Sequence, residues 1–120
     1  SFSKIKSFDQ CPKQFYHEKV IKQYPFKMTD AVRYGDQFHK AAEEYIRDGT
    51  ELDPRFSYAK GMLDALNAKK GKKLCEMRMG VTKQLEPCSF YAHDVWFRGI
   101  ADLLILNSED KLAWVIDYKT

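Results

Sequence analysis

The C-terminal stretch from Phe97 to Thr120 constrains the fold more than any other part of the chain; it reads FRGIADLLILNSEDKLAWVIDYKT. Two apolar, β-rich runs flank a polar turn at residues 107–110, which predicts a β-hairpin. Both runs are apolar enough for burial on both faces, yet Asp102 lies in the first, and Asp117 and Lys119 end the second. Burying a carboxylate or an ammonium group costs several kcal/mol unless it is paired or bound to a metal. The hairpin therefore indicates a functional use for these three groups.

The residues ahead of the hairpin show helical periodicity. Apolar residues recur at intervals of three and four, and Ser3, Pro12 and Gly49 supply start and stop signals. The pattern predicts a short helix from Ser3 and further helices at residues 13–23, 31–47 and 55–68. The side chains that the last two helices are expected to turn towards the core are Val32, Gly35, Phe38, Ala42, Tyr45, Ile46, Phe56, Ala59, Met62, Leu63 and Leu66.

Strand patterns follow the helices. They predict strands at residues 74–83 and 112–119, while residues 89–106 are long enough for one bent strand or two. Gly99 inside this run suggests a bulge or a close approach of another backbone. The predicted fold class is α+β, with N-terminal helices followed by a three-stranded, mainly antiparallel sheet.

Composition places the chain among globular proteins. Its 120 residues are 44% hydrophobic and 31% charged, which suits one domain over residues 1–120 with a single modest core. No apolar run approaches the ~20 residues that span a bilayer, so no membrane partner is expected. Three cysteines without CxxC spacing favour a reducing compartment, and hence the cytoplasm of a cell or of a phage-infected host. The chain stops directly after Lys119-Thr120, and we expect a C-terminally truncated fragment.

Several motifs occur together in one order. Asp102 followed by Asp117-Tyr118-Lys119 resembles the D…(D/E)-x-K signature of the PD-(D/E)xK nuclease superfamily, and the hairpin is similar to that of its RecB-like exonuclease branch. The opening SFSKIKSFDQCPKQFY at residues 1–16, the G-x-x-x-H helix at residues 35–39 and the strand carrying Glu76 match the same branch. The resemblance implies a restriction-endonuclease-like core, whose C-terminal part, with its Q-x-x-x-Y helix, is missing here.

The hairpin charges suit metal-assisted phosphodiester hydrolysis. Mg²⁺ and Mn²⁺ prefer oxygen ligands, which Asp102 and Asp117 on neighbouring strands can supply. Lys119 is expected ~6–7 Å along the same strand face from Asp117, where its ammonium group can orient the attacking water and stabilise the transition state.

The resemblance adds three groups to this site. It implies that the carbonyl of Tyr118 and the imidazole of His39 bind the metal, and imidazole favours Mn²⁺ over Mg²⁺. A histidine on an apolar stripe can instead be a core residue. Glu76 is expected to support the ligands, to bind a second metal, or to be an exposed strand residue.

The predicted activity is that of a Mg²⁺- or Mn²⁺-dependent deoxyribonuclease, and the resemblance favours an exonuclease in DNA recombination, repair or phage replication. DNA is the expected partner, and the resemblance suggests a helicase or recombination protein as a second. In some members of the family the cysteine equivalent to Cys11 binds a [4Fe–4S] cluster, which here would need cysteines beyond Thr120, as in the iron–sulfur nucleases of CRISPR adaptation; a buried structural cysteine is the alternative. The lysines of residues 69–73 are either a solvated helix end or phosphate contacts. A non-catalytic nucleic-acid-binding or scaffold module, with Asp117 and Lys119 as a structural ion pair, is the rival interpretation.

Overall fold

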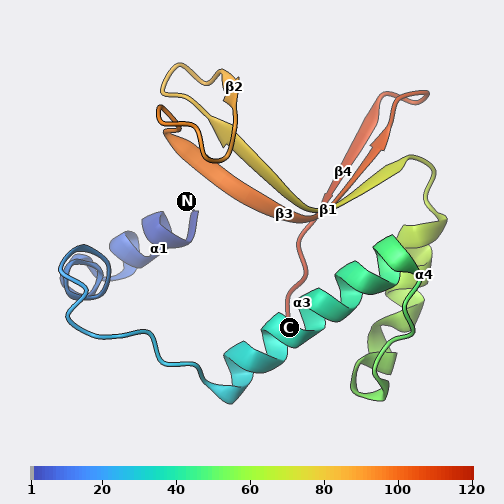
Figure 1. Ribbon diagram of the computed structural model, residues 1–120, viewed down its shortest axis with the longest axis horizontal. Coiled ribbons are helices and arrows are strands. Elements are labelled where there is room, and N and C mark those ends of the chain that lie inside the picture. The colour runs from blue at the N-terminus through green and yellow to red at the C-terminus, as the bar shows by residue number, and fades with distance from the viewer. Residues whose placement is uncertain (1) are drawn as a thin grey trace. The chain divides into compact units, whose positions relative to one another are not determined.

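The computed structural model describes residues 2–120 and has the predicted α+β class (Figure 1). Its elements are α1 (Phe2–Gln10), α2 (Pro12–Phe15), the π-helical turn η1 (Tyr16–Val20), α3 (Asp30–Asp48), the 3-10 helix η2 (Pro54–Ala59), α4 (Lys60–Ala68), β1 (Lys72–Val81), β2 (Pro87–Cys88), β3 (Phe97–Asn107) and β4 (Leu112–Ile116). The sheet order is β2-β1-β3-β4. Among residues 2–120, no helix combines the length and the apolar character that crossing a membrane requires.

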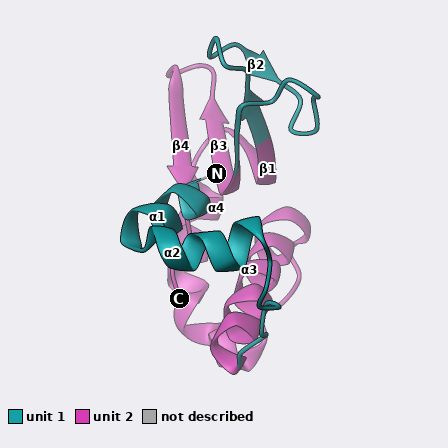
Figure 2. Ribbon diagram, turned by 90° about the vertical axis from the view of Figure 1, so that its left-hand side faces the viewer, with its two compact units in different colours: residues 1–29, 79–99 teal, residues 30–78, 100–120 magenta. Residues whose placement is uncertain are grey.

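The described chain forms two compact units (Figure 2). The first unit contains residues 2–29 and 79–99, and the second contains residues 30–78 and 100–120. Strands β1 and β3 each contribute to both units. All the residues predicted for the active site lie in the second unit.

The first unit starts with the short helix predicted from Ser3, which spans Phe2–Gln10, followed by a second helix that differs from the prediction. Cys11 caps the N-terminus of α2 by accepting a hydrogen bond from the Gln14 N–H at 3.4 Å. The helix predicted at 13–23 ends at Val20, and its residues 16–20 form a π-helix, in which the Ile21 N–H bonds to the Tyr16 carbonyl. Lys22 then adopts a φ of 51°, and this left-handed residue ends the helix.

A second correction concerns residues 89–106. Strand β1 pairs antiparallel with the two-residue strand β2 through Gly80 and Cys88, but residues 89–96 form a loop. Successive turns close this loop: the Ala92 N–H bonds to the Ser89 carbonyl at 3.0 Å, and the Val95 N–H to the Ala92 carbonyl at 3.2 Å. The predicted long strand therefore begins only at Phe97, and the sheet has four strands instead of three.

The second unit contains the principal core. Helix α3, η2 and α4 supply one side of it, and the alternating residues Leu103 and Ile105 of β3 supply the other, both with no exposed surface. The remaining buried members are Phe38, Ala42, Ile46, Phe56, Ala59, Leu63 and Tyr118. Burial of these apolar surfaces is the main favourable term in folding.

Two expectations about burial are wrong. Val32 and Met62 are 37% and 47% exposed, because the apolar stripes of α3 and α4 are wider than the surface that they cover. Strand β4 is not buried on both faces: it lies at the sheet edge, and Trp114 and Val115 are 42% and 70% exposed. The first strand of the hairpin, β3, thus belongs to the core, and the second, β4, pairs beside it at the exposed edge of the sheet.

The β3–β4 turn is held by a buried side chain. Asn107 is 9% exposed, and its Oδ1 accepts the N–H groups of Glu109 and Asp110, both at 3.1 Å. Its amide nitrogen donates to the Asp110 carboxylate at 2.7 Å. This Asx-type turn sets the antiparallel register in which Asn107 opposes Leu112 and Leu103 opposes Ile116.

Candidate metal centre

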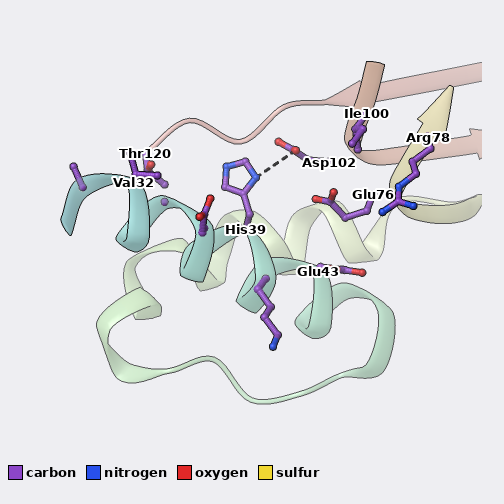
Figure 3. A pocket seen from close by; sticks show the side chains of 12 residues that line it. Val32, His39, Glu43, Glu76, Arg78, Ile100, Asp102 and Thr120 are labelled. Carbon is purple, nitrogen blue, oxygen red and sulfur yellow. Dashed lines mark ion pairs between the residues drawn. The ribbon is translucent and has the colours of Figure 1, made fainter. Parts of the chain in front are cut away.

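A cavity of about 930 Å³ in the second unit lies between α3 and the strands β1 and β3 (Figure 3). Its size falls in the range of small-molecule and substrate sites. The residues that line it are Ala31, Val32, Gly35, Asp36, His39, Lys40, Glu43, Glu76, Arg78, Ile100, Asp102 and Thr120.

Three potential metal ligands converge in this cavity. One donor atom from each of His39, Glu76 and Asp102 lies within 4.8 Å of the other two. The His39 Nδ1 is 3.3 Å from the Asp102 Oδ1, and Figure 3 shows the imidazole directed towards that carboxylate. Oxygen donors on opposite sides of a Mg²⁺ ion are ~4 Å apart, so a small contraction would bring this trio into a coordination sphere.

Two aromatic side chains contact His39, and Gly35 lies one helical turn before it on α3. Its ring meets those of Phe38 and Tyr118 edge-on, with centroids 6.2 and 5.9 Å away. One turn earlier, a Cβ at Gly35 would lie 3.4 Å from the Thr120 Oγ1. The C-terminal residue Thr120 therefore lies in van der Waals range of α3 at Gly35.

Asp102 is placed by β3 and by a backbone hydrogen bond. Its side chain is 12% exposed, and its Oδ2 accepts the N–H of Tyr118 at 2.6 Å. The phenol ring of Tyr118 is buried in the core, and burial raises its pKa to about 12. The hydrogen bond anchors the segment after β4 to the carboxylate that the hairpin buries.

Glu76 reaches the trio through an irregular backbone. It adopts a φ of 50° inside β1, a left-handed conformation that is unusual for a residue with a side chain. Such a residue costs on the order of 1–3 kcal/mol and persists where the surrounding structure enforces it. Desolvation raises the pKa of the Glu76 carboxyl, and the negative charge of Asp102 raises it further. A left-handed backbone and a raised carboxyl pKa are features that cluster at functional sites, which makes Glu76 a candidate site residue.

Replacement of Glu76 by Gln is expected to raise the thermal midpoint of the metal-free protein. The raised pKa means that the folded state binds the Glu76 proton more tightly than the unfolded state does. Ionised Glu76 therefore costs stability above that pKa, and the cost disappears as the pH falls through it. The same variant is expected to bind Mn²⁺ at least ~10–100-fold more weakly, as loss of a metal partner does. Calorimetric unfolding and Mn²⁺ titration check both effects, and a lower midpoint for E76Q would contradict the assignment.

The C-terminal motif residues lie beside the trio and not within it. Strand β4 ends at Ile116 and not at Lys119, so Asp117 and Lys119 follow the strand. Instead of lying ~6–7 Å apart along a strand face, they form an ion pair of 2.5 Å, with the Lys119 side chain 81% exposed. Lys119 lowers the pKa of Asp117, and Asp102 and His39 lower it further, so Asp117 is ionised and electrostatically coupled to the trio. Both line a separate hollow with Phe38, Tyr58, Ala59, Met62, Ile116 and Tyr118.

Sequence reasoning missed several charged residues of the cavity. Asp36 and Glu43 lie on α3 three residues before and four residues after His39, a helical spacing that could have identified them. Glu43 is also paired with Arg47. On β1, Arg78 lines the same cavity two residues after Glu76, as period-two spacing along a strand would suggest.

The arrangement of an imidazole and two carboxylates on one helix and two strands can be compared with known families. The model of the PD-(D/E)XK nuclease superfamily matches residues 1–120. The chain belongs to this superfamily. Searches of curated proteins and of solved structures gave no match.

PD-(D/E)XK nucleases act on nucleic acids with divalent metal ions, and the donor set of this chain fits such an ion. Two carboxylate oxygens match the hard-cation preference, and the imidazole nitrogen is compatible with Mn²⁺. Burial raises the pKa of Glu76 and the negative charges of Asp102 and Glu43 raise it further, and a bound cation would offset that repulsion.

Proposed function

We propose that this chain carries the metal site of a DNA-cleaving nuclease of the RecB-like branch, acting as an exonuclease in DNA recombination, repair or phage replication. The observation that carries the proposal is the convergence of His39, Glu76 and Asp102 within 4.8 Å in a chain of the PD-(D/E)XK superfamily. The Gly35–His39 motif favours the RecB-like branch, and the cluster favours Mg²⁺ or Mn²⁺. The three unpaired cysteines favour action in the cytoplasm.

His39, Glu76 and Asp102 would hold the cation, with Asp117 and the Tyr118 carbonyl as the further ligands that the family motif suggests. When bound, the ion supplies charge neutralisation at a phosphate and lowers the pKa of a coordinated water. Asp102 also orients the segment that follows β4, because it accepts the Tyr118 N–H.

Lys119 would act on the reacting water or on the developing phosphate charge. Its ammonium group pairs with Asp117, which raises the pKa of Lys119 and keeps it protonated. If the Asp117 carboxylate turned towards the cation, its ion pair with Lys119 would break. The Lys119 ammonium group would then be free to contact the reacting water or the phosphate near the metal site. Ligand binding by Asp117 and water orientation by Lys119 are thus coupled through one contact.

Replacement of Asp117 by Ala is expected to weaken Mn²⁺ binding by ~10–100-fold, because one carboxylate ligand is lost. Isothermal titration calorimetry with MnCl₂ measures this change directly. Asp48→Ala is the matched control, since that carboxylate is also exposed and paired with a cation, Arg47, and lies outside the cavity. Equal Mn²⁺ affinity in D117A and in the original chain would remove Asp117 from the ligand set.

A non-catalytic nucleic-acid-binding or scaffold function is the second candidate, and the 2.5 Å Asp117–Lys119 ion pair favours it. In that case the pair is structural, and DNA binding survives EDTA without any cleavage. In the nuclease proposal, Mn²⁺-dependent degradation of a labelled DNA strand occurs and EDTA abolishes it. The same gel assay therefore separates the two functions.

Two further features belong to this proposal. A helicase or recombination protein would deliver the DNA. An iron–sulfur cluster at Cys11 requires further cysteines after Thr120; otherwise Cys11 is a structural residue, and its sulfur accepts the hydrogen bond that caps α2. A protein that contains the cluster would be brown and absorb near ~400 nm, with Cys11 thiolate as one ligand.

A further inference from the structure

The second unit carries a lysine cluster that the metal site does not use. Lys69, Lys70, Lys72 and Lys73 follow the C-terminus of α4 and open β1. Lys73 caps the helix, because its Nζ donates to the Lys69 carbonyl at 2.8 Å. Within residues 2–120, the other three lysines form no ion pair within 4.0 Å of a carboxylate. Helix capping therefore accounts for one lysine of the four.

A glycine brings this basic turn against the end of β3. Gly71 has a φ of 128°, and a Cβ there would lie 2.5 Å from the Leu106 carbonyl oxygen, so no other residue fits. The contact forms a hollow between the lysine turn and the β3–β4 turn, lined by Lys70, Gly71, Lys72, Leu106, Asn107, Ser108 and Glu109. The buried Asn107 fixes the opposite wall of this hollow.

An aromatic side chain completes the surface. The Lys69 Nζ lies 4.0 Å from the centroid of the Trp114 ring, a cation–π contact that holds the ammonium group in place. Trp114 remains 42% exposed on the edge strand β4. Positioned lysines beside an exposed indole ring are the combination that binds single-stranded nucleic acid, through phosphate neutralisation and base stacking.

Strands β1 and β3 run from this surface to the metal centre, and their residue numbering gives the distance between the two sites. Glu76 follows Lys72 by four positions on β1, and Asn107 follows Asp102 by five positions on the neighbouring β3. At ~3.3 Å per residue these separations are ~13 and ~17 Å along the sheet.

We propose that Lys69, Lys70, Lys72 and Trp114 form a second binding surface for a single strand of DNA, ~13–17 Å along the sheet from the metal centre. Its role in holding a substrate rests on the proposed nuclease function, but its binding does not require cleavage. The surface supplies affinity that is independent of base sequence, and it orients the strand along β1 and β3.

The test is binding of a fluorescein-labelled oligothymidylate in EDTA, measured by anisotropy at increasing NaCl concentration. The double variant K70E/K72E is expected to bind at least ~10-fold more weakly, and its log–log salt slope is expected to fall by ~1.4, since each lost phosphate contact removes ~0.7. W114A is expected to reduce affinity several-fold without a comparable change of slope. The matched control is K4E/K6E, which makes the same charge change on exposed lysines of α1 in the first unit.

Equal losses in K70E/K72E and K4E/K6E would overturn the proposal, because net charge alone would then explain binding. Unchanged binding in K70E/K72E would also overturn it and leave the cluster a solvated helix end. Stronger binding of the original chain to vesicles of anionic phospholipid than to the oligonucleotide would assign the lysines to a membrane surface instead. Unfolding midpoints of the variants, and the conservative pair K70Q/K72Q, separate loss of contact from loss of fold. Binding in EDTA without Mn²⁺-dependent cleavage would reject the nuclease function and keep this surface.

Discussion

Asp102→Asn is expected to abolish Mn²⁺-dependent DNA cleavage to within assay background, a loss of at least ~10²–10³-fold. Asp102 is the one member of the trio that contacts both the imidazole of His39 and the backbone of the C-terminal segment. Asparagine keeps an oxygen that can accept the Tyr118 N–H, so the anchoring hydrogen bond survives. What is lost is the negative charge that a hard cation needs at this position.

The fold of D102N is expected to be intact, since the substitution also removes the repulsion between Asp102 and Glu76. Circular dichroism and the unfolding midpoint check that the fold is intact. Cleavage of a labelled DNA strand in MnCl₂ measures the expected loss of activity. Asp36→Asn is the matched control, because Asp36 lines the same cavity on α3 but is not among the converging donors. Cleavage by D102N at the level of D36N would show that the trio is not the catalytic metal site.

Lys119→Ala is expected to lower kcat by ~10²–10³-fold while Mn²⁺ affinity stays the same or increases. The ammonium group of Lys119 is the only cation within 4.0 Å of Asp117 among residues 2–120, and removing it frees that carboxylate for the metal. Because the ion pair is exposed, its loss should leave the unfolding midpoint unchanged. The separation of kcat from metal binding is what distinguishes water orientation from a structural ion pair.

Steady-state cleavage in MnCl₂ and Mn²⁺ calorimetry on the same preparation provide the two measurements. Lys40→Ala serves as the control, since Lys40 lies in the cavity, is 75% exposed and is paired with a carboxylate, Glu44, on its own helix. Lys119→Arg keeps the charge and the pairing with Asp117, so it should recover part of the rate. An unchanged kcat in K119A, with D102N inactive, would leave the metal site in place and remove Lys119 from the mechanism.

Much of the fold follows from local patterns. The 3.6-residue periodicity of residues 31–47 and the caps around it predicted α3 within a residue at each end, and Asp30–Asp48 is what forms. The polar turn at residues 107–110 predicted the β3–β4 hairpin, because the Asn107 side chain accepts hydrogen bonds from the backbone N–H groups of Glu109 and Asp110 two and three residues later. Such elements depend on hydrogen bonds and side-chain alternation over a few residues, and a sequence states these directly.

Burial and strand extent were less predictable. Residues 89–96 have the apolar content of a strand, but their backbone forms hydrogen bonds within local turns instead of pairing with a neighbouring strand. Strand β4 has the apolar content of a core strand, but it lies at the edge of the sheet. β-propensity does not distinguish an edge strand from a central one. In both places the outcome depends on which neighbours are available, and sequence pattern does not specify that.

For the site, the chemical groups could be named from residue types alone: His39, Asp102, Asp117, Lys119 and Glu76. Their convergence could not be predicted in this way. His39, Glu76 and Asp102 meet in a cavity that α3, β1 and β3 line together, and Glu76 adopts a left-handed φ there, whereas Asp117 and Lys119 form an ion pair with each other. Residue type sets what a group can bind, but the free energy of burial and packing sets which distant groups are brought within ligand distance.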